Sequence, residues 1–265
     1  MKAKKSFGQH FLKDEVIIEK IANSLLKTEG IRNVLEIGPG KGVLTRQLGN
    51  QDINLKVVEA DQDMVDYLID RSVIGEQQII FMDFLKLNLS RVFNGEPFYM
   101  IGNYPYNISS QILIKMINYK ELVPEMVGMF QKEVADRVVA QPGTKTYGVI
   151  SVLVQAYYEG TTILDVPPSA FIPPPKVNSS VIRLIRKKDY SLPCDERFFR
   201  NVVKTAFNQR RKMLRNTLKP LFGDVSLMDD PYFMQRPEQL SVQDFVNLTV
   251  RLTELQNNNY KNHES

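Results

Sequence analysis

Four consecutive residues, Asn103-Tyr104-Pro105-Tyr106, combine groups that could hold a flat aromatic amine. The side-chain oxygen of Asn103 and the carbonyl oxygen of Tyr104 can each accept a hydrogen bond from an NH₂ group. Pro105 favours an extended backbone at Tyr104, which helps to fix the direction of that carbonyl. The ring of Tyr106 can stack on a nucleobase, worth about 1–3 kcal/mol in single-strand recognition. Two acceptors could hold a weakly nucleophilic base amine in line with a methyl donor.

A second group of residues could bind a nucleotide-like cofactor. The segment Glu36–Gly42 has glycines at alternate positions after an apolar run, and glycine permits positive φ and close approach to a ligand. Glu59 follows Gly38 by 21 residues, where an acid can accept from a ribose. Asp83 could accept from an adenine amino group. The third glycine comes one residue too early for the NAD fingerprint, and Lys41 lacks the following Ser or Thr of a phosphate loop.

Each of these patterns also has an ordinary structural explanation. Asn-x-Pro sequences form simple turns, and glycines are common between a strand and a helix. An acid at the end of a strand is often only a solvated turn residue. We favour the functional interpretation because the three patterns occur together in one chain.

Strands that alternate with helices would position these residues. Apolar runs predict strands at 33–37, 55–58, 78–81, 98–101 and 126–130. Helical periodicity or capping signals predict helices at about 14–25, 43–48 and 62–70. This alternation predicts an α/β fold with a doubly wound, Rossmann-like, mostly parallel sheet. Gly38, Glu59, Asp83 and Asn103 all fall at strand ends, where ligands bind in such sheets.

The pattern changes beyond the proline cluster Pro173-Pro174-Pro175, which cannot lie inside a helix or a central strand. The chain then becomes helical, and Ser241 opens a last helix with Asp244 at its third position. We therefore expect a catalytic domain at 1–187 and a smaller, mainly helical, basic domain at 188–265.

Positive charge is concentrated in one part of the chain. The segment from Lys176 to Lys219 holds 13 Lys and Arg against 3 Asp and Glu, a local charge of +10 in a chain of net charge +4. Such concentration is typical of a protein with a polyanionic partner. Solvated helix faces explain the charge alone about equally well.

Composition excludes several other classes. Cys194 is the single cysteine, so no intramolecular disulfide can form, and only two histidines are present, so we expect no metal site. No segment approaches the roughly 20 apolar residues of a membrane helix. The basic N-terminus is not followed by an apolar run, so it is not a secretory signal and we expect a cytoplasmic protein.

The chain resembles the small-subunit ribosomal RNA adenine dimethyltransferases, the kasugamycin-sensitivity family, over nearly its whole length. The resemblance rests on motifs that occur together and in order: Phe7–Leu12, Glu36–Gly40, Asp83, Gly102–Ser109, Gln131–Val134, Val166–Phe171, Pro173–Val177 and Ala206–Lys212. Two positions depart from the family pattern, which commonly has Asn where His10 stands and Leu where Tyr104 stands.

The resemblance implies S-adenosyl-L-methionine as the cofactor. The cofactor contacts it implies, with Gly40 added from the glycine turn, are His10, Leu12, Gly38, Gly40, Glu59, Asp83 and Asn103. It also implies that Phe171 helps to hold a flipped adenine, beside the catalytic segment Asn103–Tyr106. We expect RNA phosphates to contact Lys176, Arg210, Arg211, Lys212 and Arg215.

The expected activity is dimethylation of two adjacent adenosines in the 3′-terminal hairpin loop of small-subunit ribosomal RNA. The expected partner is the 30S pre-ribosomal particle, and the protein is expected to be a monomer. We expect the small residues Gly102 and Ser109 to leave room for the first methyl group. The alternatives are a large-subunit RNA methyltransferase that confers macrolide resistance, a non-catalytic RNA-binding assembly factor, and a DNA adenine methyltransferase.

Overall fold

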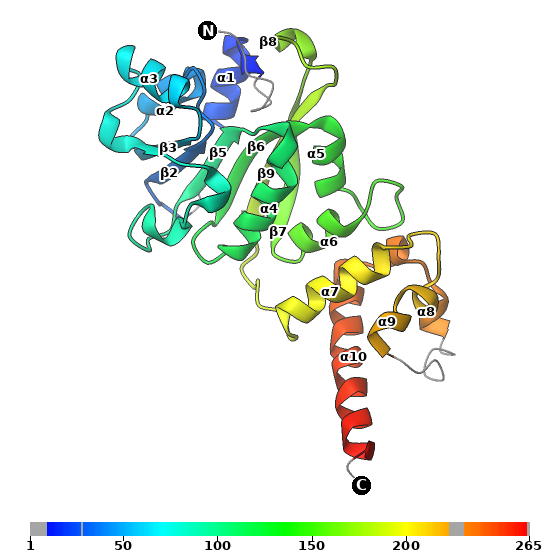
Figure 1. Ribbon diagram of the computed structural model, residues 1–265. Helices are drawn as coiled ribbons and strands as arrows, with labels where there is room; N and C mark the ends of the chain where they lie inside the picture. The colour runs from blue at the N-terminus through cyan, green and yellow to red at the C-terminus, as the bar shows by residue number, and fades with distance from the viewer. Residues whose placement is uncertain (1–9, 28, 223–230, 264–265) are drawn as a thin grey trace. The chain divides into compact units, whose positions relative to one another are not determined.

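The computed structural model describes residues 10–27, 29–222 and 231–263 (Figure 1). The Phe7-Gly8-Gln9 part of the N-terminal motif therefore lies outside the described residues. The chain divides into two compact units. The first comprises Met1–Asp136 and Tyr158–Lys187, and the second comprises Arg137–Tyr157 and Lys188–Ser265.

A seven-stranded sheet forms the centre of the first unit, in the order β4-β3-β2-β5-β6-β9-β7. The five strands of the predicted alternation run parallel: β2 (Asn33–Ile37), β3 (Asn54–Glu59), β4 (Ile79–Phe81), β5 (Tyr99–Asn103) and β6 (Glu125–Gln131). Two further strands, β9 (Ser179–Arg186) and β7 (Tyr158–Val166), extend the sheet antiparallel to β6. The predicted doubly wound, mostly parallel sheet is confirmed.

Short helices connect these strands: α1 (Glu15–Ala22), α2 (Val43–Gly49), α3 (Gln62–Asp70), α4 (Ser109–Asn118) and α5 (Lys132–Val138). α4 crosses in front of the strands in the view of Figure 1. Asp14 caps α1 by accepting from the backbone N–H of Ile17 at 3.1 Å, and Asp61 caps α3 in the same way. Apolar residues of α1, α2 and α3 pack against β2, β3 and β5 in one core cluster.

A two-stranded ribbon joins the beginning of the described chain to a distant segment. β1 (Phe11–Leu12) pairs antiparallel with β8 (Phe171–Ile172). The backbone N–H of Lys13 donates to the carbonyl of Ala170 at 2.9 Å and continues this pairing. The ribbon therefore fixes His10 and Leu12 relative to the loop that precedes β9.

The second unit is helical: α6 (Val149–Gln155), α7 (Glu196–Phe207), α8 (Leu214–Thr217), α9 (Lys219–Phe222) and α10 (Val242–His263). α10 begins with a capping box in which the Asp244 carboxylate accepts from the N–H of Ser241 at 2.9 Å, and the Ser241 hydroxyl accepts from the N–H of Asp244 at 3.1 Å. None of the helices in the described ranges is long and apolar enough to cross a membrane.

The units change at Lys187, close to the boundary expected from the sequence. The sequence prediction did not separate Arg137–Tyr157 from the first 187 residues, but this segment groups with the second unit. The physical reason is α6, whose apolar sequence VISVLVQ packs against α7 and α10. The assignment of RNA binding to residues 188–265 stays a prediction.

Candidate functional site

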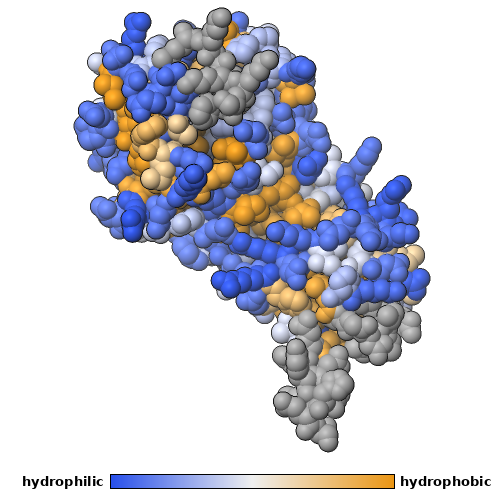
Figure 2. Space-filling model, viewed as in Figure 1, coloured by the Kyte–Doolittle hydropathy of each residue, from blue (hydrophilic) through white to orange (hydrophobic). Residues whose placement is uncertain are grey.

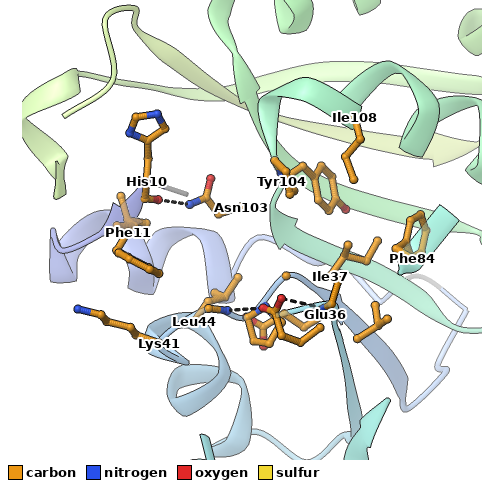
Figure 3. Close-up of a pocket in the computed structure, with 18 of the residues that line it drawn as sticks. His10, Phe11, Glu36, Ile37, Lys41, Leu44, Phe84, Asn103, Tyr104 and Ile108 are labelled. Carbon is orange, nitrogen blue, oxygen red and sulfur yellow. Dashed lines mark hydrogen bonds between the residues drawn. The ribbon is translucent and has the colours of Figure 1, made fainter. Parts of the chain in front are cut away.

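A cavity of about 640 Å³ lies within the first unit, beyond the carboxyl ends of the parallel strands (Figure 3). Its walls come from β1, the turn after β2, and the ends of β3, β4 and β5. The predicted residues that line it are His10, Leu12, Gly38, Gly40, Glu59, Asp83, Asn103, Tyr104, Pro105 and Tyr106. The fold thus brings together residues that are up to 96 positions apart in the sequence, from His10 to Tyr106.

The glycine turn has the backbone conformation that the sequence predicts. Gly38, Gly40 and Gly42 have φ of 66°, 53° and 70°, in the left-handed region that favours glycine. A Cβ atom at Gly40 would lie 3.2 Å from the ring of Phe11, and one at Gly42 would lie 2.5 Å from Val73. These glycines therefore permit close packing on both sides of the turn.

The carboxyl group of Glu59 is held at the end of β3 by backbone donors. Its Oε1 accepts from the N–H groups of Ala60 at 2.8 Å and Asp61 at 2.9 Å. Its Oε2 accepts from the N–H of Gly40 at 3.2 Å, which ties the acid to the glycine turn. Burial raises the pKa of Glu59, and these backbone hydrogen bonds oppose the rise. The acid is therefore oriented before any ligand arrives.

Asp83 lies just after β4, the edge strand of the sheet. β3 separates β4 from β2, the strand that leads into the glycine turn. Its Oδ1 accepts from the N–H of Leu85 at 2.8 Å, a cap on the short 3₁₀ turn Phe84–Lys86. The neighbouring side chains Met82 and Phe84 also line the cavity. A carboxylate beside apolar side chains can recognise the amino edge of a flat heterocycle.

Asn103 ends β5, and its side-chain amide has a defined orientation. Nδ2 donates to the carbonyl oxygen of His10 at 3.0 Å (Figure 3). Because a carbonyl can only accept, this contact directs the amide nitrogen towards β1 and leaves Oδ1 as the atom that can accept from a ligand. No hydrogen bond to Oδ1, or to the carbonyl of Tyr104, comes from the described residues.

The side chain of Tyr104 has a structural role. Its ring is 1% exposed, packs edge-on against Phe130 at a centroid distance of 5.1 Å, and fills the space over two glycines, Gly102 and Gly128. A Cβ atom on Gly128 would overlap with this ring. Tyr104 therefore offers only its backbone to the cavity chemistry, as expected from the sequence.

The prediction that Gly102 and Ser109 leave room for a methyl group is wrong. The Tyr104 ring occupies the space beside Gly102, where a Cβ atom would also lie 2.6 Å from the carbonyl of Ile37. The buried Ser109 donates its hydroxyl to the carbonyl of Tyr106 at 3.0 Å. Neither residue lines the cavity.

Tyr106 begins a 3₁₀ turn, Tyr106–Ile108, and presents an aromatic ring beside the cavity. The ring stacks on His10 with a centroid distance of 5.5 Å and an interplanar angle of 26°. The hydroxyl shares a hydrogen bond of 2.6 Å with the hydroxyl of Ser179 in β9. His10 is itself held by a 2.9 Å contact between Nδ1 and the carbonyl of Pro173.

Phe171 is not brought into the cavity. Its side chain is 1% exposed and belongs to the hydrophobic core, whereas the next residue, Ile172, lines the cavity and is 57% exposed. A contact between Phe171 and a base would require it to leave this packing. The role that the family resemblance implies for Phe171 stays a prediction.

Glu36 is a residue that the sequence interpretation did not single out. It lies inside β2, lines the cavity, and is 1% exposed. Burial raises its pKa to about 8, the nearby Thr45 hydroxyl lowers it, and the carboxylate of Glu59 raises it further. The signal was an acid within a run of buried apolar residues, a position that charged side chains seldom occupy without a partner.

The predicted RNA-binding residues divide between the two units. Lys176 is exposed in the loop between β8 and β9 of the first unit. Arg210, Arg211 and Lys212 follow α7 in the second unit, and Arg215 lies in α8. Arg210 donates to the carbonyl of Thr144 at 3.0 Å. On the face shown in Figure 2, a band of hydrophilic residues runs along α7.

Comparison with known proteins gives a consistent family. The profile described as "Ribosomal RNA adenine dimethylase" matches residues 1–240. A protein of Flavobacterium johnsoniae named ribosomal RNA small subunit methyltransferase A is 50% identical over 252 residues, covering 95% of this chain and 96% of its own. One of the same name from Bacteroides thetaiotaomicron is 51% identical over 255 residues, covering 96% and 95%.

Solved structures support the fold. A dimethyladenosine transferase from Plasmodium falciparum is similar with a TM-score of 0.77 at 24% identity, covering 93% of this chain and 98% of its own. The 23S rRNA methyltransferase ErmE is similar with a TM-score of 0.67 at 23% identity, covering 92% and 99%.

Proposed function

Because the chain belongs to the ribosomal RNA adenine dimethylase family, we propose that it transfers methyl groups from S-adenosyl-L-methionine to adenosines of small-subunit ribosomal RNA. The observation that carries this function is the cavity. It places a glycine turn, two strand-end acids and the segment Asn103–Tyr106 around one space. The protein is an enzyme, and its product is N6-methylated adenosine.

The residues that line the cavity fit S-adenosyl-L-methionine. Glu59 offers an oriented carboxylate to the ribose hydroxyls, and Asp83 offers another to the adenine amino group. The glycine turn lets the backbone approach closely at Gly38 and Gly40. When bound, the cofactor supplies a methyl group activated by a sulfonium centre. Leu12 and His10 would close the site from the β1 side.

The segment Asn103–Tyr106 orients the target amine. Asn103 Oδ1 and the Tyr104 carbonyl accept one hydrogen each from the adenine NH₂, which draws the nitrogen lone pair away from the ring and towards the methyl donor. The contact between Asn103 Nδ2 and His10 fixes the first acceptor, and Pro105 restricts the backbone of Tyr104, which carries the second. This orientation supplies catalysis by proximity, and the product ammonium loses its proton without a dedicated base.

Tyr106 provides the stacking surface for the base. Its ring stacks on His10 and its hydroxyl is hydrogen-bonded to Ser179, so the orientation of the ring is fixed before a base arrives. A hairpin-loop adenosine is unpaired, so taking it out of its stack is less costly than from a duplex. We therefore favour two adjacent adenosines of the 3′-terminal loop of small-subunit RNA as the target.

Two methyl groups on one amine can be transferred in succession. After the first transfer the amine keeps one hydrogen, and rotation about the carbon–nitrogen bond exposes its nitrogen again. One acceptor is then unused, so the second transfer is less well oriented. Since Gly102 and Ser109 provide no space, the first methyl group must be accommodated by the cavity wall itself, where Asn107 and Ile108 follow the motif.

The basic residues provide the second half of the proposal. We assign RNA phosphates to Lys176 in the first unit and to Arg210, Arg211, Lys212 and Arg215 in the second. The substrate would be the RNA within the 30S pre-ribosomal particle, bound by a monomer in the cytoplasm. The local charge of +10 between Lys176 and Lys219 supports a polyanionic substrate.

A direct test is transfer of a labelled methyl group from S-adenosyl-L-methionine to purified substrates. Label should enter under-methylated small ribosomal subunits and leave large subunits and DNA unlabelled. ErmE, a methyltransferase of large-subunit RNA, has a fold similar to that of this chain. The relatives at 50% and 51% identity, however, are named for the small subunit. Labelling of large subunits alone would reverse this choice, and no labelling at all would favour the non-catalytic alternative.

A further inference from the structure

The short turn that follows Asp83 is bonded to a lysine of α4. The Leu85 carbonyl accepts a hydrogen bond from Lys115 Nζ at 2.8 Å, and the same ammonium lies 5.2 Å from the centroid of the Phe84 ring. Asp83, Phe84 and Leu85 all line the cavity, whereas Lys115 lines another, more open depression together with Leu85. The lysine therefore contacts the wall of the cavity without facing a ligand inside it.

Leu85 connects this lysine to Asp83. Its N–H donates to Asp83 Oδ1 at 2.8 Å, and its carbonyl accepts from Lys115. The other carboxylate oxygen of Asp83, Oδ2, accepts no hydrogen bond from the described residues. Because the backbone of Leu85 is bonded on both sides, the direction in which Asp83 presents Oδ2 depends on where Lys115 holds the turn.

Lys115 places an ammonium group in a partly buried position. Burial lowers its pKa, and the charge of the Asp83 carboxylate opposes this change. Partial loss of hydration is unfavourable for an ammonium unless its contacts compensate for it. Four residues of α4 near the lysine are buried in the core and give it a rigid base: Ile112, Leu113, Met116 and Ile117.

We propose that Lys115 is a positioning residue for the adenine part of the cofactor. It holds the turn Phe84–Lys86 so that Asp83 Oδ2 accepts from the adenine amino group and the Phe84 ring lies beside the base. The inference rests on the proposed cofactor, S-adenosyl-L-methionine. Lys115 thus makes the cavity selective for adenine over a purine that lacks the amino group, although it touches neither.

Titration calorimetry on the full chain tests the proposal with two ligands. One is S-adenosylhomocysteine, the demethylated cofactor, and the other is its analogue with hydrogen in place of the adenine amino group. The wild type should prefer the first about 10-fold or more, since the amino group donates to a charged acceptor. Lys115→Met keeps most of the side-chain length and removes the ammonium. It should reduce this preference to about 3-fold or less, because only the ligand with the amino group loses a contact.

Lys56→Met is the matched control, because Lys56 forms the same two kinds of contact elsewhere in the first unit. Its Nζ donates to the carbonyl of Val92 at 2.7 Å and lies 5.1 Å from the centroid of the Phe93 ring. None of these three residues lines the cavity, so this variant should leave the preference between the ligands unchanged. Lys115→Arg restores a donor and a cation, and it should regain most of the preference.

Two further readouts separate positioning from a general loss of stability. Asp83→Asn keeps an oxygen that can accept from Leu85 but removes the carboxylate that faces adenine. In this background Lys115→Met should cause little further loss of preference, because the two residues act through one contact. In steady-state methyl transfer, Lys115→Met should raise the KM for S-adenosyl-L-methionine about 5-fold and leave kcat within about 2-fold of the wild type.

The outcomes separate the two proposals. An equal loss of affinity for both ligands in Lys115→Met, or the same change in Lys56→Met, overturns the positioning role and leaves the proposed function intact. A wild type without preference between the ligands also overturns it. Failure of the wild type to bind S-adenosyl-L-methionine overturns both proposals. If Lys115→Met did not fold, Lys115→Gln, whose side chain is one atom shorter and uncharged, would carry the same prediction.

Discussion

Asn103 shows how a single contact determines chemistry. The His10 carbonyl can bond only to the amide nitrogen, so the oxygen is left for the substrate. Replacement of this amide should affect catalysis far more than folding, because the side chain lies at the end of a strand and is only half-buried.

Asn103→Ala should reduce methyl transfer at least about 100-fold while preserving RNA affinity, because it removes one of two acceptors that orient the amine. Single-turnover assays with excess enzyme would measure the rate, and filter binding would measure the RNA affinity. Circular dichroism would check the fold. Near wild-type turnover in the variant would contradict the acceptor role.

Glu36 also predicts a pH dependence of stability. The folded empty protein holds the proton up to a pKa of about 8, whereas the unfolded chain releases it near 4.5. The folded state therefore binds more protons between these values, so the Glu36 contribution lowers stability as pH rises through this window, and the loss is complete above it.

Glu36→Gln cannot release a proton, so it removes this loss of stability with rising pH. Relative to wild type, the variant should gain stability between pH 5 and pH 9, reaching a few kcal/mol at the upper end. Urea unfolding at these two pH values would measure the gain. Glu19→Gln, on the exposed face of α1, should follow the wild type at both. A constant difference between Glu36→Gln and wild type across this range would show that Glu36 does not titrate as described.

The elements determine where these side chains meet. β2, β3, β4 and β5 end at the same edge of a parallel sheet, and so the acids and the Asn103 segment converge there. The close packing of β5 against β6 depends on Gly102 and Gly128, which leave room for the Tyr104 ring. This packing sets the direction of the Tyr104 backbone.

Gly128→Ala should destabilise the protein by about 1–3 kcal/mol and lower turnover, because the added methyl group would overlap with the Tyr104 ring. Gly49→Ala is a suitable control, since a Cβ atom there would meet nothing within 4 Å at the end of α2. Chemical denaturation and methyl transfer assays would measure both effects. Equal stability of the two variants would show that the Tyr104 packing is easily displaced.

The sequence predicted the parallel part of the sheet because its strands are short apolar runs bounded by turn residues and acids. β7 was missed because Tyr158–Val166 is an edge strand with several exposed polar residues. The grouping of α6 with the second unit was missed because an apolar segment does not indicate which elements cover it. The strand-end residues were predictable from spacing, whereas the burial of Glu36, Tyr104 and Phe171 depends on three-dimensional packing.

At the scale of the whole molecule, the cavity and most of the residues predicted to bind RNA belong to different units. The cavity that holds the acids and Asn103 lies within the first unit, and most of the predicted phosphate contacts lie in the second. Arg211 and Lys212 are exposed, and neither forms an ion pair with a described acid. They are therefore available to a polyanion.

Arg211→Ala combined with Lys212→Ala should weaken RNA binding without changing affinity for S-adenosyl-L-methionine. Each lost phosphate contact should reduce the slope of log affinity against log salt by about 0.7–0.9. Binding to small subunits across a salt series would measure this slope. Glu19→Gln again serves as a surface control. An unchanged slope in the double variant would place the RNA elsewhere.

The central claim is that this cavity dimethylates adjacent adenosines of small-subunit RNA. Mass spectrometry of nuclease digests from under-methylated small subunits, sampled during reaction with limiting enzyme, tests it most directly. Monomethyladenosine should appear first, because the second transfer has one acceptor fewer, and dimethyladenosine should replace it at two neighbouring positions of the terminal loop. A reaction that stops at monomethyladenosine with excess enzyme and cofactor, or modification confined to large-subunit RNA or DNA, would contradict the account.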